Sequence, residues 1–254
     1  MRVHVLGCSG GLGAGLQTTS LRIDDDVLID AGTGVAALDA RAMASVRHIL
    51  LTHSHLDHIA GIPLLLDTVF DRLGDTVTVY GQAETLDALR SHIFNNVIWP
   101  DFSRLPSPDR PVLRYRTLAP GEVLELGERR FEMLPARHVV PTVGYRVTSP
   151  SGGFAFTGDS TTNDAFWRAL NSGPPIDVLI MEVAFPDEDV ELCRKAGHYS
   201  PQMLAADLAK LEHRPKVYIT HNKPGSELRI YEQCRAHLNG RPLYRLFGGQ
   251  RFEL

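Results

Sequence analysis

The feature that most constrains the fold of this chain is a run of six residues, His-Ser-His-Leu-Asp-His, at positions 53–58. His53 and His55 are two residues apart, so in an extended backbone both side chains point to the same side. Asp57 and His58 follow in a segment that is predicted to open a helix. Neutral imidazoles and carboxylates suit zinc, manganese or iron. Because four potential ligands in six residues cannot all reach one tetrahedral ion, the run predicts two ions held close together.

Short apolar segments predict strands in both halves of the chain, each run of strands being followed by helices. The predicted strands are residues 2–6, 20–23, 27–29, 47–52, 76–80, 130–135, 145–149, 153–157, 178–182 and 216–220. The predicted helices are residues 59–73, 164–170, 201–211 and 226–237. This order implies two sheets packed on each other with helices outside, a layered α/β arrangement. No Pro-, Gly- or Ser-rich linker and no repeat divides the chain, so we expect a single domain over residues 1–254.

Five polar residues stand at, or just after, the carboxyl ends of predicted strands: Asp30, His53, Asp159, Glu182 and His221. Sites in α/β proteins lie at such edges. Any one of these residues also suits an ordinary strand cap, and an aspartate before a glycine also suits a turn. Five of them after successive strands favour a shared site.

Charge and cysteine content limit the setting of the protein. The chain has 26 basic and 30 acidic residues. It therefore lacks the excess of positive charge that favours nonspecific binding to nucleic acid or membranes. Cys8, Cys193 and Cys234 lie far apart and form no C-x-x-C pair, which favours neither a disulfide framework nor a thiolate metal cage. We therefore expect a reducing, cytoplasmic setting. No apolar stretch has the length of a signal peptide core or of a membrane span, so we expect no membrane partner.

The run at 53–58 resembles the H-x-H-x-D-H signature of the metallo-β-lactamase superfamily. His138 in R-H-V-V-P, Asp159 in T-G-D-S and His221 in Y-I-T-H match the later ligands of that family in order. The resemblance spans almost the whole chain and implies a four-layer αββα sandwich, with two mixed sheets inside and helices outside. The ligands that it implies are His53, His55 and His138 for one ion, Asp57, His58 and His221 for the other, and Asp159 between them.

The resemblance also implies the cofactors and a residue behind them. We expect two divalent ions, with zinc as the first choice and manganese or iron as alternatives. A water molecule between two cations loses a proton far more readily than bulk water, so hydroxide is available as a nucleophile near neutral pH. Asp30 resembles the family's early aspartate, and we interpret it as orienting a ligand histidine through its ring N–H.

Three further segments resemble class II cyclic-nucleotide phosphodiesterases, which are related to tRNase Z. Residues 92–102, H-I-F-N-N-V-I-W-P-D-F, resemble their H-I-F-N-x-x-I-W-P-x-F run. Residues 182–186, E-V-A-F-P, resemble an E-x-[ST]-F element that both families carry. Residues 197–201, G-H-Y-S-P, resemble their G-H-[LS]-[TS]-[PA] turn, and T-H-N-K-P at 220–224 is close to T-H-x-K-P. These segments narrow the expected target to a phosphodiester.

The resemblance implies roles for three catalytic residues, Asp57, Glu182 and His198. A departing phosphodiester oxygen needs a group that protonates it, and His198 is the candidate, oriented by Glu182 if the two approach. The alternative is that His198 simply begins the helix that follows it, with Ser200 as its N-cap.

Substrate contacts are expected from Asn95, Trp99 and Lys223. An aromatic-rich loop near a metal site suits stacking on a nucleobase, although the same aromatics also suit core packing. Lys223 is a candidate for binding a nonbridging phosphate oxygen, and a solvated loop lysine is the alternative.

The choice of substrate depends on departures from the two family patterns. Residues 61–66, G-I-P-L-L-L, are nearer to the tRNase Z form. Against tRNase Z, Leu56 replaces a glycine, and only the 20 residues 139–158 separate His138 from Asp159, which leaves no room for a tRNA-clamping arm. We therefore expect hydrolysis of 3′,5′-cyclic nucleotides (cAMP or cGMP) to 5′-monophosphates, in an enzyme that the resemblance suggests is a homodimer, with nucleic acid disfavoured as a partner. The alternatives are another phosphodiester, such as RNA 3′ ends, and an iron-loaded redox or sensor protein with the same ligands.

Overall fold

The computed structural model describes residues 1–238 and 240–254, and within them two seven-stranded sheets account for most strands. The first sheet consists of β1 (Arg2–Gly7), β2 (Ser20–Ile23), β3 (Val27–Ile29), β4 (His48–Leu50), β5 (Val77–Gly81), β8 (Leu113–Thr117) and β16 (Arg251–Glu253). The second consists of β9 (Val123–Leu126), β10 (Arg129–Pro135), β11 (Val143–Ser149), β12 (Gly152–Phe156), β13 (Val178–Glu182), β14 (Lys216–Thr220) and β15 (Leu243–Arg245). A separate short ribbon is formed by β6 (Pro106–Ser107) and β7 (Arg110–Pro111).

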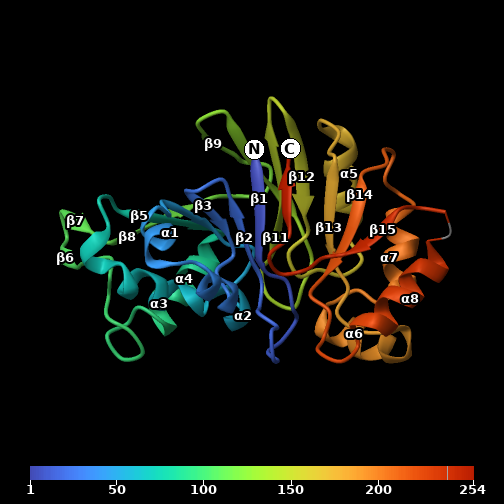
Figure 1. The fold of residues 1–254 in the computed structure, drawn as a ribbon, viewed down its shortest axis with the longest axis horizontal. Helices are drawn as coiled ribbons and strands as arrows, with labels where there is room; N and C mark the ends of the chain where they lie inside the picture. The colour runs from blue at the N-terminus through green and yellow to red at the C-terminus, as the bar shows by residue number, and fades with distance from the viewer. Residues whose placement is uncertain (239) are drawn as a thin grey trace.

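Both sheets are mixed and follow the same plan. The first has the order β16-β1-β2-β3-β4-β5-β8, antiparallel up to β3 and parallel beyond it. The second has the order β9-β10-β11-β12-β13-β14-β15, antiparallel up to β12 and parallel beyond it. Because β1 pairs with β16, the two ends of the chain lie side by side (Figure 1).

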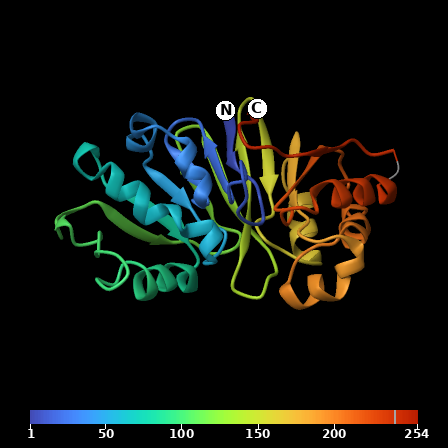
Figure 2. The same cartoon turned by 60° about the horizontal axis from the view of Figure 1, so that its bottom comes forward.

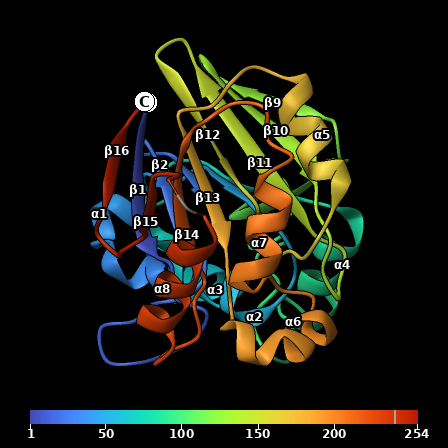
Figure 3. The same ribbon diagram turned by 90° about the vertical axis from the view of Figure 1, so that its right-hand side faces the viewer.

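Helices cover the outer face of each sheet, because parallel neighbours need crossover connections. The first half of the chain contains η1 (Thr33–Ala37), α1 (Ala40–Ala44), α2 (Leu56–Ile59), α3 (Gly61–Thr68), η2 (Phe70–Arg72) and α4 (Ala83–His92). The second half contains α5 (Asp164–Ser172), η3 (Asp187–Asp189), α6 (Val190–Ala196), α7 (Pro201–Leu208) and α8 (Glu227–His237). The two sets lie on opposite sides of the central strands (Figures 1 and 2), and α5 and α7 lie in front of the second sheet in Figure 3.

Three apolar layers hold the four layers of secondary structure together. Alternate strand residues face opposite sides of a sheet. In β4, Leu50 lies between the two sheets, whereas Ile49 packs on the helices outside the first sheet. In β13, Ile180 lies between the sheets, whereas Leu179 packs with Trp167 of α5 outside the second sheet. The predicted four-layer αββα arrangement is therefore confirmed.

The helix predicted over residues 59–73 is wrong at its start and in its continuity. The structure has α2 from Leu56, a separate α3 from Gly61, and a short η2 in place of the end of the predicted helix. The break arises because the N–H of Gly61 bonds to the carbonyl of Ala31, and a Cβ at Gly61 would lie 2.5 Å from the carbonyl oxygen of Gly32. The other predicted elements agree to within three residues at each end, but the sequence prediction missed the helices α1, α4, α6, η1 and η3 and the strands β6, β7, β8, β9, β15 and β16.

Within the described residues, none of the helices combines the length and the apolar character that crossing a membrane requires.

Candidate metal centre

The structure brings together all seven side chains that the sequence proposes as metal ligands, at the edge where strands of both sheets end. They stand after β4, in α2, and after β10, β12 and β14: His53, His55, Asp57, His58, His138, Asp159 and His221. Because each sheet supplies part of this set, the cluster forms only when the two sheets pack together.

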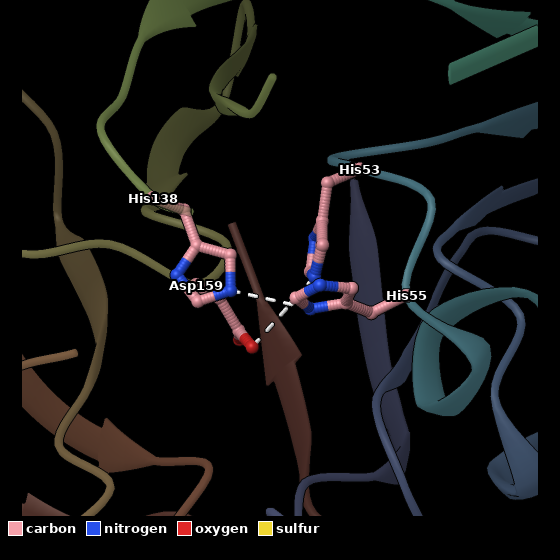
Figure 4. A group of neighbouring side chains, drawn as sticks. All are labelled: His53, His55, His138 and Asp159. Carbon is pink, nitrogen blue, oxygen red and sulfur yellow. Dashed lines mark hydrogen bonds and ion pairs between the residues drawn. The ribbon is translucent and has the colours of Figure 1, made fainter. Parts of the chain in front are cut away.

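The first group contains three imidazoles and a carboxylate: His53, His55, His138 and Asp159. One ligand atom from each lies within 4.8 Å of the others. The Nε2 atom of His138 is 3.2 Å from Nδ1 of His55, and Nε2 of His53 is 3.8 Å from Oδ2 of Asp159. Figure 4 shows these side chains converging from opposite sides on one small space.

The second group shares Asp159 with the first and adds Asp57, His58 and His221. The Oδ1 atom of Asp159 is 3.3 Å from Nε2 of His58 and 3.2 Å from Nδ1 of His221. Oδ2 of Asp57 lies 3.8 Å from Nε2 of His221. One oxygen of Asp159 therefore faces each group, and its carboxylate lies between them.

The buried polar atoms of the cluster test whether cations fit there. Among the described residues, Nε2 of His53, Nε2 of His58 and Oδ1 of Asp159 are buried without a hydrogen-bond partner. Buried polar atoms normally have one, because leaving a polar atom unpaired away from water costs free energy. A cation supplies the missing partner for all three, and nitrogen and carboxylate donors without sulfur suit zinc, manganese or iron. The cluster is thus suitable for binding metal ions.

Burial sets the protonation of most of these groups. It lowers the pKa of His138 to about 4 and that of His221 to about 3, which leaves both imidazoles neutral near pH 7, the form that binds a metal. Burial also opposes charge on His58 and Asp159, but Nε2 of His58 lies 3.3 Å from Oδ1 of Asp159, which is within ion-pair distance although the two atoms make no hydrogen bond. The Asp159 carboxylate raises the pKa of His58 well above its usual value, and the neighbouring imidazoles hold the pKa of Asp159 well below its own.

Asp30 lies behind the second group rather than in it. Its Oδ2 accepts hydrogen bonds from Nδ1 of His58 at 2.7 Å and from the hydroxyl of Thr52 at 2.8 Å, and its Oδ1 accepts from the Thr52 N–H at 2.8 Å. The backbone of Asp30 has a φ of +55°, which few residues other than glycine adopt and which often marks a functional site. These contacts leave Nε2 of His58 free to face Asp159, as the sequence interpretation of Asp30 requires.

His53 and His138 each have a comparable partner on the ring nitrogen that points away from the cluster. Nδ1 of His53 is 3.0 Å from the Thr52 hydroxyl, and Nδ1 of His138 donates to the carbonyl of Gly197 at 2.8 Å. Such partners fix the orientation and tautomer of a ligand imidazole. His221 itself has a φ of +58°, a strained backbone that its N–H bond to the carbonyl of Cys8, 2.8 Å long, helps to maintain.

His198 and Glu182 approach each other beside both groups. Nδ1 of His198 is 2.9 Å from Oε1 of Glu182, and the His198 ring lies 4.8 Å from that of His138 and 5.5 Å from that of His221. Burial raises the pKa of Glu182; burial opposes charge on His198 as well, but the Glu182 carboxylate raises the pKa of that histidine. The helix α7 begins only at Pro201, so His198 lies outside it.

The sequence prediction did not single out Phe185, whose ring lies 5.7 Å from that of His198. The ammonium nitrogen of Lys223 is 5.8 Å from the Phe185 ring and donates to the carbonyl of Gly10 at 2.7 Å. Lys223 is therefore held beside His198 rather than extended into solvent. The signal for Phe185 is its position three residues after Glu182, in the segment already noted for its resemblance.

Asn95 and Trp99 lie in the loop after α4. Oδ1 of Asn95 accepts from the N–H groups of Val97 at 3.0 Å and Ile98 at 2.9 Å, so this side chain shapes its own loop. Trp99 packs against the core that contains Phe94. None of the hydrogen bonds in the described residues joins Asn95 or Trp99 to the cluster, and their contact with substrate stays a prediction.

Comparison with protein families gives a match over most of the chain. A model of the beta-lactamase superfamily domain matches residues 25–221. A probable 3′,5′-cyclic-nucleotide phosphodiesterase of Yersinia pestis is 31% identical over 204 residues, which cover 71% of this chain and 58% of that protein. A ribonuclease Z of Methanopyrus kandleri is 33% identical over 127 residues, covering 49% of this chain and 40% of the relative. The chain thus spans about half the length of these two relatives. A ribonuclease Z of Bradyrhizobium sp. (strain ORS 278) is 33% identical over 234 residues, covering 71% of this chain and 74% of the relative.

Solved structures share the fold at lower sequence identity. Unliganded yeast PDE1 has a TM-score of 0.84 and 18% identity, with 100% of this chain and 99% of that chain covered. The metallo-beta-lactamase fold protein YhfI of Bacillus subtilis has a TM-score of 0.78 and 22% identity, with 100% and 99% covered. The predicted resemblance is confirmed: this chain belongs to the metallo-β-lactamase superfamily of hydrolases, among homologues that include cyclic-nucleotide phosphodiesterases and ribonuclease Z.

Proposed function

We propose that this protein is a phosphodiesterase with two metal ions that hydrolyses 3′,5′-cyclic nucleotides to nucleoside 5′-monophosphates. The observation that carries the proposal is the pair of His198 and Glu182, at 2.9 Å, beside the two ligand groups. Opening a phosphodiester requires a nucleophile, stabilisation of charge on the phosphoryl oxygens and a proton for the departing oxygen. In the proposal, ions in the ligand groups supply the nucleophile and stabilise the charge, and His198 with Glu182 supplies the proton.

The seven ligands divide as the family pattern implies. In this proposal one ion would be held by His53, His55 and His138 and the other by Asp57, His58 and His221, and Asp159 would be available to both. Bound there, two divalent ions supply a nucleophile near neutral pH and neutralise negative charge on phosphoryl oxygens. The side chain of Asp57 is 33% exposed, so this proposed catalytic residue and ligand is open to solvent.

His198 acts as the general acid in this proposal. Its Nδ1 proton is held by the buried carboxylate of Glu182, which also accepts the Ser160 N–H at 3.1 Å. This arrangement fixes the ring and favours its charged form, from which a proton is donated to the departing ribose oxygen.

Phe185 and Lys223 are the proposed substrate contacts nearest to His198. An aromatic face suits a nucleobase, and an ammonium group suits a nonbridging phosphate oxygen. Asn95 and Trp99, in the loop after α4, complete the proposed set of substrate contacts.

A ribonuclease Z-like activity on RNA 3′ ends is the second candidate, because ribonuclease Z is among the relatives. The segment between His138 and Asp159 bears on this choice. It is occupied by β11 and β12, which pair directly from Tyr145↔Phe156 to Ser149↔Gly152. This tight hairpin and a net charge of −4 favour a small substrate over folded tRNA.

A substrate panel tests the proposal. Metal-loaded protein is assayed with cAMP, cGMP, bis(p-nitrophenyl) phosphate, a precursor tRNA, a lactone and a β-lactam, alongside metal analysis. We expect turnover of the cyclic nucleotides, and a loss of kcat of about 100-fold in His198→Gln with metal content retained. Turnover confined to the lactone or β-lactam contradicts the proposal, and turnover confined to precursor tRNA favours the second candidate.

A further inference from the structure

A buried carboxylate outside the metal centre binds three parts of the second half of the chain. Asp207 lies in α7 and is 2% exposed. Its Oδ2 accepts hydrogen bonds from the hydroxyl of Tyr199 at 2.7 Å, from Nε1 of Trp167 at 3.3 Å and from the N–H of Asn163 at 3.3 Å. Its Oδ1 accepts from the ammonium of Lys210 at 2.7 Å. Because burying a carboxylate is costly unless it is paired, these donors are held firmly in place.

Tyr199 is the donor that leads to the metal centre, because it directly follows His198. Its ring is buried, its N–H donates to Oε1 of Glu182 at 3.3 Å, and its carbonyl accepts from the N–H of Ala184 at 3.1 Å. With the hydroxyl on Asp207, Tyr199 is fixed at its amide, its carbonyl and the far end of its ring. Burial and the Asp207 carboxylate raise the pKa of the Tyr199 hydroxyl, so it remains a donor.

The residues just before Tyr199 contact both functional parts of the site. Gly197 has a φ of +71°, and its carbonyl accepts from Nδ1 of His138 at 2.8 Å. The N–H of His198 donates to the carbonyl of Cys193 at 2.9 Å. The turn formed by residues 197–199 therefore orients a proposed metal ligand through Gly197 and a proposed general acid through His198.

We infer that Asp207 and Tyr199 are positioning residues for this turn. The hydrogen bond between them holds the turn in the position in which His198 contacts Glu182 and the Gly197 carbonyl contacts His138. The inference rests on the proposed function where it concerns catalysis. The alternative is that Asp207 only joins α5 and α7. In that case, removing any one of its donors is expected to change kcat and amide exchange to the same extent.

The test compares Tyr199→Phe with Lys210→Gln. Each substitution removes one donor from the same carboxylate, but Lys210 lies at the surface, and its ammonium group bonds to Asp164 and Asp207 rather than to a residue of the turn. Small misplacements of reacting groups lower rates steeply, so we expect Tyr199→Phe to lower kcat for cAMP about 10-fold with little change in KM or metal content. Lys210→Gln is expected to keep the wild-type kcat.

Hydrogen exchange of the metal-free proteins gives a readout that does not depend on the substrate. In Tyr199→Phe, the amides of His198 and Tyr199 are expected to exchange at least several-fold faster than in the wild type, whereas Lys210→Gln leaves them protected. Faster exchange with no turnover of any phosphodiester by the wild type would support the positioning role while refuting the proposed function. Unchanged exchange in Tyr199→Phe, or equal losses in both variants, would overturn the inference.

Discussion

Asp159 is the residue on which both ligand groups depend, because one of its oxygens faces each group. Replacing Asp159 by alanine removes the shared ligand and leaves the His58 imidazole without its main charged partner. We expect Asp159→Ala to lose both metal ions rather than one, as measured by metal analysis of the dialysed protein. Retention of a full complement of two ions by this variant would contradict the shared role of Asp159.

The reactivity of the cysteines tests whether a thiolate takes part in the candidate metal centre. Burial raises the pKa of Cys8 from 9.0 to about 11 and that of Cys193 to about 12. A raised thiol pKa means less thiolate at a given pH, so at pH 8 the reactive fraction of Cys8 falls about 100-fold. We expect iodoacetamide to modify the native protein far more slowly than the urea-unfolded chain, without loss of metal. Rapid native modification accompanied by metal release would show that a thiolate takes part in the site.

The residues of the candidate metal cluster could be identified from the sequence because their spacing is local or follows a motif, as in His53 and His55. The partners that orient them could not all be found this way. Phe185 and the Gly197 carbonyl stand on either side of α6, and the contact of Gly197 with His138 joins residues that are 59 positions apart in the chain.

At the scale of elements, Gly197 ends α6 in the left-handed region, and a Cβ there would lie 3.0 Å from Nδ1 of His138. Alanine in this region costs ~1 kcal/mol of stability. Gly127 offers a matched control, since it has a φ of +62° and nothing within 4 Å of its Cβ position. Both alanine variants are expected to lose similar stability on urea unfolding, but only Gly197→Ala is expected to bind metal more weakly. Equal metal affinity in the two variants would show that the end of α6 does not influence metal binding.

The strands show where element prediction succeeds. β2, β3, β13 and β14 have the predicted bounds, because β3, β13 and β14 contain continuous apolar segments and β2 alternates Leu21 and Ile23 with polar residues. The division between α2 and α3 was not predictable, since it depends on the bond from Gly61 to Ala31 in a distant loop. The short edge strand β16 was missed because its own three residues carry little strand signal. Its hydrogen bonds to β1 hold it in the sheet.

At the scale of the whole molecule, the metal centre joins the two sheets, because His53 follows a strand of the first sheet and His221 follows a strand of the second. Bound ions therefore stabilise the packed form and not the separated halves. A metal present at 1,000 times its Kd adds ~4 kcal/mol to the stability, so chelation is expected to lower Tm by many degrees. Thermal unfolding with and without EDTA measures this effect. Asp159→Ala is the control, since its Tm is expected not to respond to EDTA; an unresponsive wild-type Tm would contradict a structural contribution from bound metal.

The four-layer fold follows from the order of apolar strands and helices, and the edge that carries the candidate metal centre follows from ligand-type residues in α2 and after the strands β4, β10, β12 and β14. The substrate does not follow in the same way, because one ligand set on this fold serves many reactions. Only residues around the candidate metal ligands, such as His198 with Glu182, favour phosphodiester hydrolysis over the other reactions of this fold.

The most direct test of the central claim is phosphorus NMR of cAMP incubated with the metal-loaded protein. We expect the cyclic phosphodiester signal to be replaced by that of the 5′-monophosphate, and we expect His198→Gln with its metal retained to slow this conversion about 100-fold. An unchanged cAMP signal with a protein that holds both ions, or equal conversion by His198→Gln, would contradict it.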